Sequence, residues 1–398
     1  MSSQVLLTPT IITKESLVIL ENNLVAANRV NRKFENQFVK IGSSLTIRKP
    51  NRFTVASGAS LQVQNIAEPS VTITVDQQQH VDFQFTSQDL TLTVEEFSER
   101  YLKPGMAALA NKVDFDVLTN TFDFSNYVGT PSVTPAAFSS SVQLTGRRMD
   151  DNAAPQDGRT LVFNPAAYWA VANGLTPSFV MPTAKDALVK GYLATIGNYE
   201  VYMDQNVQNG SGTSHNSAVA FQVTTAQGNG ASTTLWGGAA TDGITPGECF
   251  TIAGVFNVNP QSRQSTGVLK NFVVTATTAP TGTSFPINFS PAIVTSGPYQ
   301  NVTGPASTGS GITWLTGTSN AQITSPNNLS FTRDAIGLVM VPLEIPQGVD
   351  FAARETYRNI SLRVIRAYDI NNDVFPTRID MLYGTTVFYD ELGCRLGG

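Results

Sequence analysis

Between residues 13 and 38, hydrophobic side chains recur at spacings of three or four residues, with one gap. Thr13 can cap a helix that starts there, and Glu15 lies in its first turn. The pattern predicts an amphipathic helix over residues 13–38. Such a helix either packs on its own subunit or forms an arm that crosses onto a neighbouring one. Its apolar positions are Leu17, Leu20, Leu24, Val30, Phe34 and Phe38.

Between residues 42 and 86 the repeat of the hydrophobic pattern changes to every second residue. Three short runs, at residues 45–48, 71–75 and 81–85, alternate apolar and polar side chains, as half-buried strands do. The runs predict a long two-stranded excursion with a polar turn at residues 76–80. A hairpin of this kind is at best marginally stable alone in water. We therefore expect it to lie against something else, in this chain or in another.

The strongest helical signal follows the excursion. Thr93 and Glu96 form a capping-box pattern, and apolar residues continue at helical spacing towards residue 121. Pro104 either breaks this run or occupies the first position of a second helix. The pattern predicts a long, kinked helix over residues 93–121. Residues 125–205 then mix short strand and helix patterns.

The composition changes sharply at residue 206. Residues 206–332 are rich in Gly, Ser, Thr, Asn and Pro and contain several short strand patterns separated by turn residues. Their tryptophans and phenylalanines would suit a disordered linker poorly, so we expect an inserted all-β domain, a small barrel or sandwich. Beyond residue 332 strand patterns return and complete the domain that the insertion interrupts. The only charged residues of the insertion are Asp242, Glu248, Arg263 and Lys270.

Composition narrows the class of protein. Hydrophobic residues make up 41% of the 398 residues, enough for a sizeable core, whereas charged residues make up only 14%, against roughly 25% in ordinary globular domains. The net charge of −5 argues against binding nucleic acid by neutralising phosphates, although a protein can enclose DNA without gripping it. We find no signal-peptide pattern and no membrane-spanning run, and expect the protein to be made and kept in a cytoplasm at first.

Side chains that could support catalysis or bind metals are sparse. His80 lies in the predicted turn, His215 in a Gly- and Ser-rich segment, and neither belongs to a recognisable catalytic motif. Cys249 and Cys394 are far apart in sequence, and Cys249 fits a small buried residue at a strand start. We therefore expect no enzyme activity, cofactor or metal. The adjacent carboxylates, which are more typical of solvated faces than of acid–base sites, are Glu95–Glu96, Asp150–Asp151 and Asp390–Glu391.

The order of these patterns resembles the HK97-like major capsid proteins of tailed phages. The insertion resembles the extra barrel domain of coat proteins from short-tailed phages, with a similar strand pair at residues 247–255. The other stretches that carry the resemblance are residues 42–50, 108–114, 147–155 with 159–165, 191–202 and 378–384.

The resemblance implies an α+β fold of the HK97-like capsid type with an inserted all-β barrel. We expect an N-terminal arm at 1–40, an extended β loop at 41–90, a spine helix of the peripheral domain at 91–124, the first part of an axial domain at 125–205, the inserted barrel at 206–332, and the remaining axial and peripheral strands at 333–398.

It also implies a function. The subunit would assemble as hexamers and pentamers into an icosahedral shell that encloses double-stranded DNA without sequence-specific binding and without a membrane. Implied partners are copies of itself, a separate scaffolding protein and a portal protein, with a decoration protein left open. The protein would belong to the virion and reside in the host cytoplasm during assembly. The alternatives are an encapsulin-like nanocompartment shell and a β-rich tail or depolymerase protein.

Charged residues around the predicted hairpin are candidates for ion pairs between subunits. The competing interpretation is that they are solvated surface charges of little energetic consequence. The candidates are Arg48, Lys49 and Arg52 near the base of the hairpin and Glu68 and Asp76 near its far arm.

Overall fold

The computed structural model describes residues 9–34, 44–64, 66, 68–86, 98–137, 140–175, 195–212, 221–237, 243–277, 284–317, 323–349 and 351–398. The chain forms two compact units, and it passes between them several times. The first comprises Met1–Ile47, Ser70–Val117 and Gly337–Thr386, and the second Arg48–Pro69, Leu118–Ile336 and Val387–Gly398.

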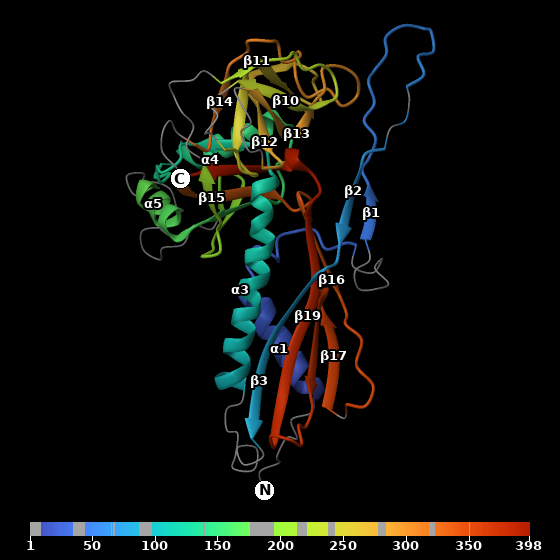
Figure 1. The fold of residues 1–398 in the computed structure, drawn as a ribbon, viewed down its shortest axis with the longest axis vertical. Coiled ribbons are helices and arrows are strands. Elements are labelled where there is room, and N and C mark those ends of the chain that lie inside the picture. Colours follow the sequence, from blue (N-terminus) through green and yellow to red (C-terminus); the bar gives the residue numbers. More distant parts are fainter. Residues whose placement is uncertain are drawn as a thin grey trace. The chain divides into compact units, whose positions relative to one another are not determined.

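A five-stranded sheet, here called the long sheet, organises the first unit (Figure 1). Its strands lie in the order β16-β19-β18-β17, and β3 pairs with β19 in antiparallel register from Val374↔Thr86 to Tyr383↔Gln77. Helix α1 packs against β17 and β18. The bounds are α1 Pro9–Asn23, β3 Gln77–Thr86, β16 Ile336–Val341, β17 Phe351–Tyr357, β18 Ile360–Arg366 and β19 Val374–Val387.

The predicted helix over residues 13–38 is too long, because α1 ends at Asn23. The Asn28 side chain donates to the carbonyls of Glu21 and Leu24, at 3.0 and 2.8 Å, and so closes the helix. The buried carboxylate of Asp114 then accepts the backbone N–H groups of Val25 and Ala27, both at 2.8 Å. A distant side chain thus replaces the helical hydrogen bonds of this segment. Residues 35–38 lie outside the described residues.

Helix α3, Lys103–Thr119, occupies much of the predicted 93–121 helix and follows a single π-helical turn at Ser98–Leu102. Pro104 does not end the helical run and is the second residue of α3, one position after the first position that we predicted. In the first turn of a helix a missing N–H costs no hydrogen bond. Met106, Leu109 and Val113 form part of its buried face. The capping-box residues Thr93 and Glu96 lie outside the described residues.

The predicted turn of the excursion is wrong. Strand β1, Ser44–Arg48, pairs with β2, Ser70–Thr74, while residues 77–80 already belong to β3, which pairs with β19. His80 is therefore a strand residue, and its imidazole contacts Asp82 at 2.7 Å. Alternation in the sequence shows that a run is a strand but does not say which strand is its partner.

The stem formed by β1 and β2 packs against the long sheet of its own subunit. Ile73 and Val75 are buried in one cluster with Val339, Val341 and Leu382, and Leu45 and Ile47 pack against it. The backbone also comes close, because a Cβ at Gly384 would lie only 2.0 Å from the Thr74 carbonyl oxygen. The part of the excursion outside this stem is the segment between the two strands, residues 49–69, which we call the extended loop.

The second unit contains a mixed sheet in the order β4-β20-β15-β5-β7-β6, with β8 pairing to β15. Strands β20 and β4 are parallel, as are β5 and β7, whereas β15 is antiparallel to both of its neighbours in this order. Helices α4 and α5 contribute to its core. The bounds are β4 Tyr127–Gly129, α4 Val142–Asp151, β5 Arg159–Phe163, α5 Pro165–Leu175, β6 Thr195–Ile196, β7 Tyr199–Met203, β8 Asn209–Gly212, β15 Ile323–Thr332 and β20 Gly393–Gly397.

The same unit contains a six-stranded sheet in the order β14-β11-β12-β13-β10-β9. It closes on itself, because Gln222 of β9 bridges Gly311 beside β14 and Ile312 N–H donates to the Phe221 carbonyl at 2.7 Å. The expected small barrel is therefore present, with Phe250, Phe272 and Phe289 at its centre. The bounds are β9 Gln222–Val223, β10 Ala231–Gly237, β11 Cys249–Val258, β12 Ser265–Val274, β13 Ser284–Ile293 and β14 Ile312–Trp314.

The Asp114 carboxylate gives a first test. We expect Asp114→Ala to lower the free energy of unfolding by about 2 to 4 kcal/mol, because two buried N–H groups lose their acceptor, and Asp114→Asn to cost less because one acceptor oxygen remains. Urea unfolding of the unassembled subunit measures both. The control is Asp157→Ala at an exposed aspartate, expected within about 0.5 kcal/mol of the parent. Equal losses for Asp114→Ala and Asp157→Ala would contradict the role given to Asp114.

Candidate assembly site: the extended loop and its base

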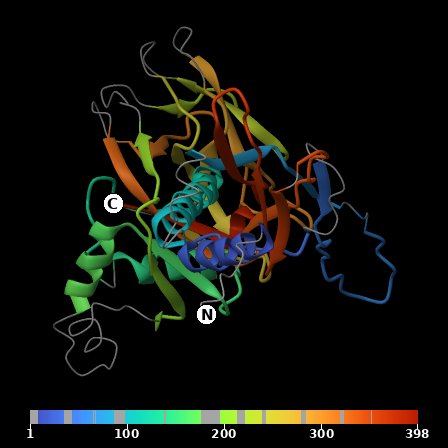
Figure 2. The same cartoon turned by 90° about the horizontal axis from the view of Figure 1, so that it is seen from below.

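The extended loop exposes hydrophobic side chains. In Figures 1 and 2 the loop is drawn in blue and connects β1 to β2. Soluble monomers rarely present large contiguous apolar surface, and where they do it marks an interaction site. The exposed residues alternate with polar ones along both arms of the loop. They are Phe53, 62% exposed, Val55, 99%, Leu61, 89%, Val63, 82%, and Ile66, 70%.

One side chain ties the two arms together. Thr54 N–H donates to the Gln64 side-chain oxygen at 2.8 Å, and the Gln64 amide nitrogen donates back to the Thr54 carbonyl. This reciprocal pair imitates the paired hydrogen bonds of an antiparallel ladder. Gly58 lies between the arms with a φ of +105°, a backbone conformation that favours glycine. The loop is therefore organised although it contains no strand among its described residues.

The base of the loop is closed by a backbone hydrogen bond and an ion pair. Lys49 N–H donates to the Pro69 carbonyl at 2.8 Å, and Arg48 pairs with Glu68 at 3.1 Å. Because both charged side chains are largely exposed, an ion pair of this kind contributes at most about 1 kcal/mol. The backbone bond and the paired strands thus fix where the loop begins and ends.

Three further contacts join the base to the C-terminal segment and to the inserted domain. Arg52 forms an ion pair with Glu391, and the Lys49 ammonium lies 4.9 Å from the centre of the Tyr389 ring. Tyr299 donates its hydroxyl hydrogen to Asn51 at 2.9 Å. Burial disfavours the charge on Arg52, but the hydrogen bond and charge of Glu391 outweigh it and raise the pKa of Arg52.

Four of the five predicted contact residues meet at this base. Arg48, Lys49, Arg52 and Glu68 lie within it and contact residues of their own chain. Asp76 is not among them: it lies between β2 and β3 and is exposed. Ion pairing with a neighbouring subunit stays a prediction for all five.

Sequence reasoning missed the partners of the base, Tyr299, Tyr389 and Glu391. The only signal was the adjacent pair Asp390–Glu391, which we interpreted as solvated. Asp390 departs from that interpretation, because its carboxylate accepts the Ser125 N–H at 2.6 Å and the Ser125 hydroxyl at 2.5 Å. Glu391 departs from it through its ion pair with Arg52.

The cysteines are buried residues of the interior. Cys249 begins β11, as expected for a small residue at a strand start, and both thiols are inaccessible. Burial raises the pKa of Cys249 to about 11 and that of Cys394 to about 12. Because the thiolate is the nucleophile, neither cysteine is suited to covalent catalysis at neutral pH. His215 lies outside the described residues.

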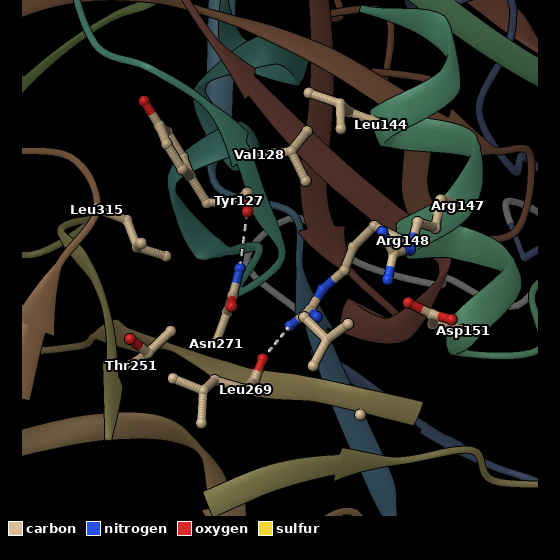
Figure 3. Close-up of a pocket in the computed structure, with 12 residues that line it drawn as sticks. Tyr127, Val128, Leu144, Arg147, Arg148, Asp151, Thr251, Leu269, Asn271 and Leu315 are labelled. Atoms are coloured by element: carbon tan, nitrogen blue, oxygen red, sulfur yellow. Dashed lines mark hydrogen bonds between the residues drawn. The ribbon is translucent and has the colours of Figure 1, made fainter. Parts of the chain in front are cut away.

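A cavity of about 470 Å³ lies between α4 and β12 (Figure 3). Arg148 reaches across it and donates to the Leu269 carbonyl at 3.2 Å, and Asn271 donates to the Tyr127 carbonyl at 2.7 Å. Arg148 thus joins α4 to the inserted barrel, and Asn271 joins the barrel to β4. Across the described residues, no group of three His, Cys, Asp or Glu side chains could hold a metal ion, and no helix is long and apolar enough to cross a bilayer.

An N-terminal helix, an extended loop between two paired strands, a long helix, and a barrel inserted into a mixed sheet define an HK97-like capsid subunit. The chain belongs to the P22 coat protein family, since the family model described as P22 coat protein, gene protein 5, matches residues 1–398. Its function is that of a major capsid protein of tailed phages, a structural component of the virion that assembles into a shell, and it is not an enzyme. The family match does not favour the nanocompartment alternative.

Several solved structures are similar to this chain. A chain from Mycobacterium phage Che8 is 13% identical with a TM-score of 0.52, over 94% of this chain and 92% of that one. The capsid of cyanophage P-SCSP1u matches at 11% identity and a TM-score of 0.43, over 93% and 85%. The CUS-3 coat protein I-domain matches at 23% identity and a TM-score of 0.20, over 24% of this chain and 95% of that one. No curated protein sequence matches the chain.

The Gln64 side chain gives a second test. We expect Gln64→Leu to speed hydrogen exchange at the Thr54 amide, because that N–H loses its acceptor, while the free energy of global unfolding stays within about 0.5 kcal/mol. Exchange followed by mass spectrometry of a peptide spanning residues 50–60 measures the effect. Gln62→Leu, at an exposed neighbouring position, is the matched control. Indistinguishable exchange in the two variants would show that Gln64 does not organise the loop.

Proposed function

We propose that the extended loop is the element by which one subunit holds the next in the shell. The observation that carries this proposal is the row of exposed apolar side chains on a loop whose stem and base make contacts within their own subunit. A fixed base presents the loop in one orientation, which lowers the entropy lost when it docks. Burying Val55, Leu61 and Val63 on a neighbour would supply hydrophobic free energy that the isolated subunit lacks.

The proposal extends to the architecture of the shell. Subunits would assemble as hexamers and pentamers into an icosahedral shell around double-stranded DNA, with a separate scaffolding protein and a portal protein, in the host cytoplasm. A decoration protein is a further candidate partner. The net charge of −5 supports a shell that encloses DNA without neutralising its phosphates.

We also propose the division of the chain that the sequence suggests: an arm at 1–40, a loop region at 41–90, a spine helix at 91–124, an axial domain at 125–205 that resumes in 333–398 with the C-terminal peripheral strands, and an insertion at 206–332. The barrel strands, which run from Gln222 to Trp314, support the position of the insertion.

Among the five charged candidates, Asp76 is the one we propose to pair most directly with a neighbouring subunit. It is exposed and makes no ion pair within the described part of the chain. Arg48 and Glu68 would act as a pair that a neighbour can join, while Lys49 and Arg52 mainly fix the base of the loop.

The experiment changes the loop and leaves the fold intact. We expect the double variant Val55→Ser, Val63→Ser to unfold at the same urea concentration as the parent, because both side chains are exposed in the isolated subunit, but to fail to form closed shells. Negative-stain microscopy and sedimentation, with a scaffolding protein supplied to parent and variant alike, measure assembly. The control is Gln62→Ser, which leaves the apolar positions unchanged and should assemble normally. Normal closure of shells by the double variant would refute the role of the loop.

A further inference from the structure

A second cavity lies at the base of the extended loop and has no role in the functions described above. Its volume is about 310 Å³, room for roughly ten waters at about 30 Å³ each. Three parts of the second unit form its walls: the start of the loop, the inserted barrel and the C-terminal segment. The charged and phenolic residues that line it include Lys49, Arg52, Lys270, Tyr299, Asp390 and Glu391.

Lys270 is the unusual member of this cavity. It lies on β12 of the barrel and is only 3% exposed, and its ammonium makes no hydrogen bond or ion pair within 4 Å among the described residues. Burial and the charge of Arg148 lower the pKa of Lys270, and the charges of Asp390 and Glu391 oppose that effect without lying within 4 Å. Lysine is almost never fully buried unless it is paired, because removing a charge from water without a partner costs several kcal/mol. The insertion contains very few charged residues, so a buried lysine here is a specific feature that needs a physical explanation.

The other polar groups of the cavity are already engaged. Glu391 pairs with Arg52, and the Asp390 carboxylate accepts two hydrogen bonds from Ser125. Tyr299 donates to Asn51. The two carboxylates are fewer than the three cationic side chains, and both act on Lys270 only at separations longer than an ion pair.

Lys49 lies in the same cavity and adds to the excess positive charge. Its side chain is half-buried against the Tyr389 ring, and desolvation lowers the pKa of Lys49 even though Glu391 and Asp390 oppose that effect. An ammonium group has three donors and no acceptor. The group that would complete this cavity is therefore an acceptor that carries negative charge.

We infer that the cavity is a binding site for a small oxyanion, a carboxylate or a phosphate, held by the ammonium groups of Lys270 and Lys49. The anion would give Lys270 the partner in direct contact that Asp390 and Glu391 do not supply, and would accept hydrogen bonds from both lysines. It would come either from solution or from an acidic side chain of a neighbouring copy of the chain. Because the walls include the loop base and the barrel, an occupied site would also hold these two elements together. This inference does not rest on the proposed role of the loop.

Direct binding of inorganic phosphate to the unassembled subunit is the first experiment. Isothermal titration at constant ionic strength, with chloride as the reference anion, should give saturable binding to the parent protein. Lys270→Met should weaken it by about tenfold or more, because a charged hydrogen bond is lost. The control, Lys14→Met at an exposed lysine of α1, should bind as the parent does. Absence of saturable binding to the parent, or equal affinity in Lys270→Met, overturns the site.

Thermal unfolding provides an independent readout. Phosphate should raise the unfolding midpoint of the parent and of Lys14→Met, since a ligand that binds only the folded state stabilises it, and should raise that of Lys270→Met less. Should Lys270→Met fail to fold, Lys49→Met replaces it, because Lys49 is only half-buried and its loss is easier to accommodate. An undiminished phosphate effect in the lysine variant that folds would also overturn the site.

The source of the anion is distinguished by comparing subunits with closed shells. Phosphate that binds both forms equally identifies a free anion as the ligand. Phosphate that binds the subunits but is excluded from shells identifies an acidic side chain of a neighbouring copy, which fills the cavity on assembly. Binding to neither form contradicts the inference.

Discussion

A two-stranded ribbon cannot hold its shape alone in water, because it has too few neighbours to compensate for the entropy of ordering it. The stem of the extended loop meets this constraint by burying Ile73 and Val75 against Val339, Val341 and Leu382 of the long sheet. In the segment beyond the stem, by contrast, Val55, Leu61 and Val63 are largely exposed. Because these apolar side chains are exposed in the monomer, its stability does not depend on them. They are therefore available for contact with another copy of the chain.

The base of the loop shows how a protein with few charges uses them. Arg52 and Glu391 pair where the loop meets the C-terminal segment. In the barrel, Glu248 is 1% exposed and accepts the Thr245 N–H at 3.2 Å, and Lys270 is 3% exposed. These two residues are among the four charges that interrupt the uncharged insertion. Because charged residues are rare in the insertion, the presence of Glu248 and Lys270 in the sequence indicated positions with a structural role. Most surface charges carry no such information.

Much of the fold could be predicted from local patterns. The helix at Lys103–Thr119 and the barrel of the insertion both follow from hydrophobic spacing and turn residues. What could not be predicted depends on partners distant in the sequence. Helix α1 ends at Asn23 where Asn28 closes it, and Asp114 then takes over the next backbone N–H groups. Strand β3 pairs with β19 rather than with the run before it.

The same limit applies to the candidate site. The sequence placed Arg48, Lys49, Arg52 and Glu68 close together because they flank one loop, and the structure brings them to its base. It could not place Asp76 correctly, because the position of the turn was wrong, and it gave no indication that Tyr299 and Glu391 would meet residues 51 and 52. Contacts of that sequence separation arise from topology, which residue spacing does not encode.

Strand β20 has a consequence for the order in which the subunit can fold. It lies between β4 and β15 in the mixed sheet, and its Arg395 donates to the Gly247 carbonyl at the start of the barrel. Residues 393–397 leave the ribosome after every other strand of that sheet, so β4 and β15 must wait without their shared neighbour during synthesis. Pairings between such distant segments close large loops and form slowly. The mixed sheet therefore cannot be completed before β20 has been synthesised, and the β4 and β15 edges that flank it stay unpaired until then.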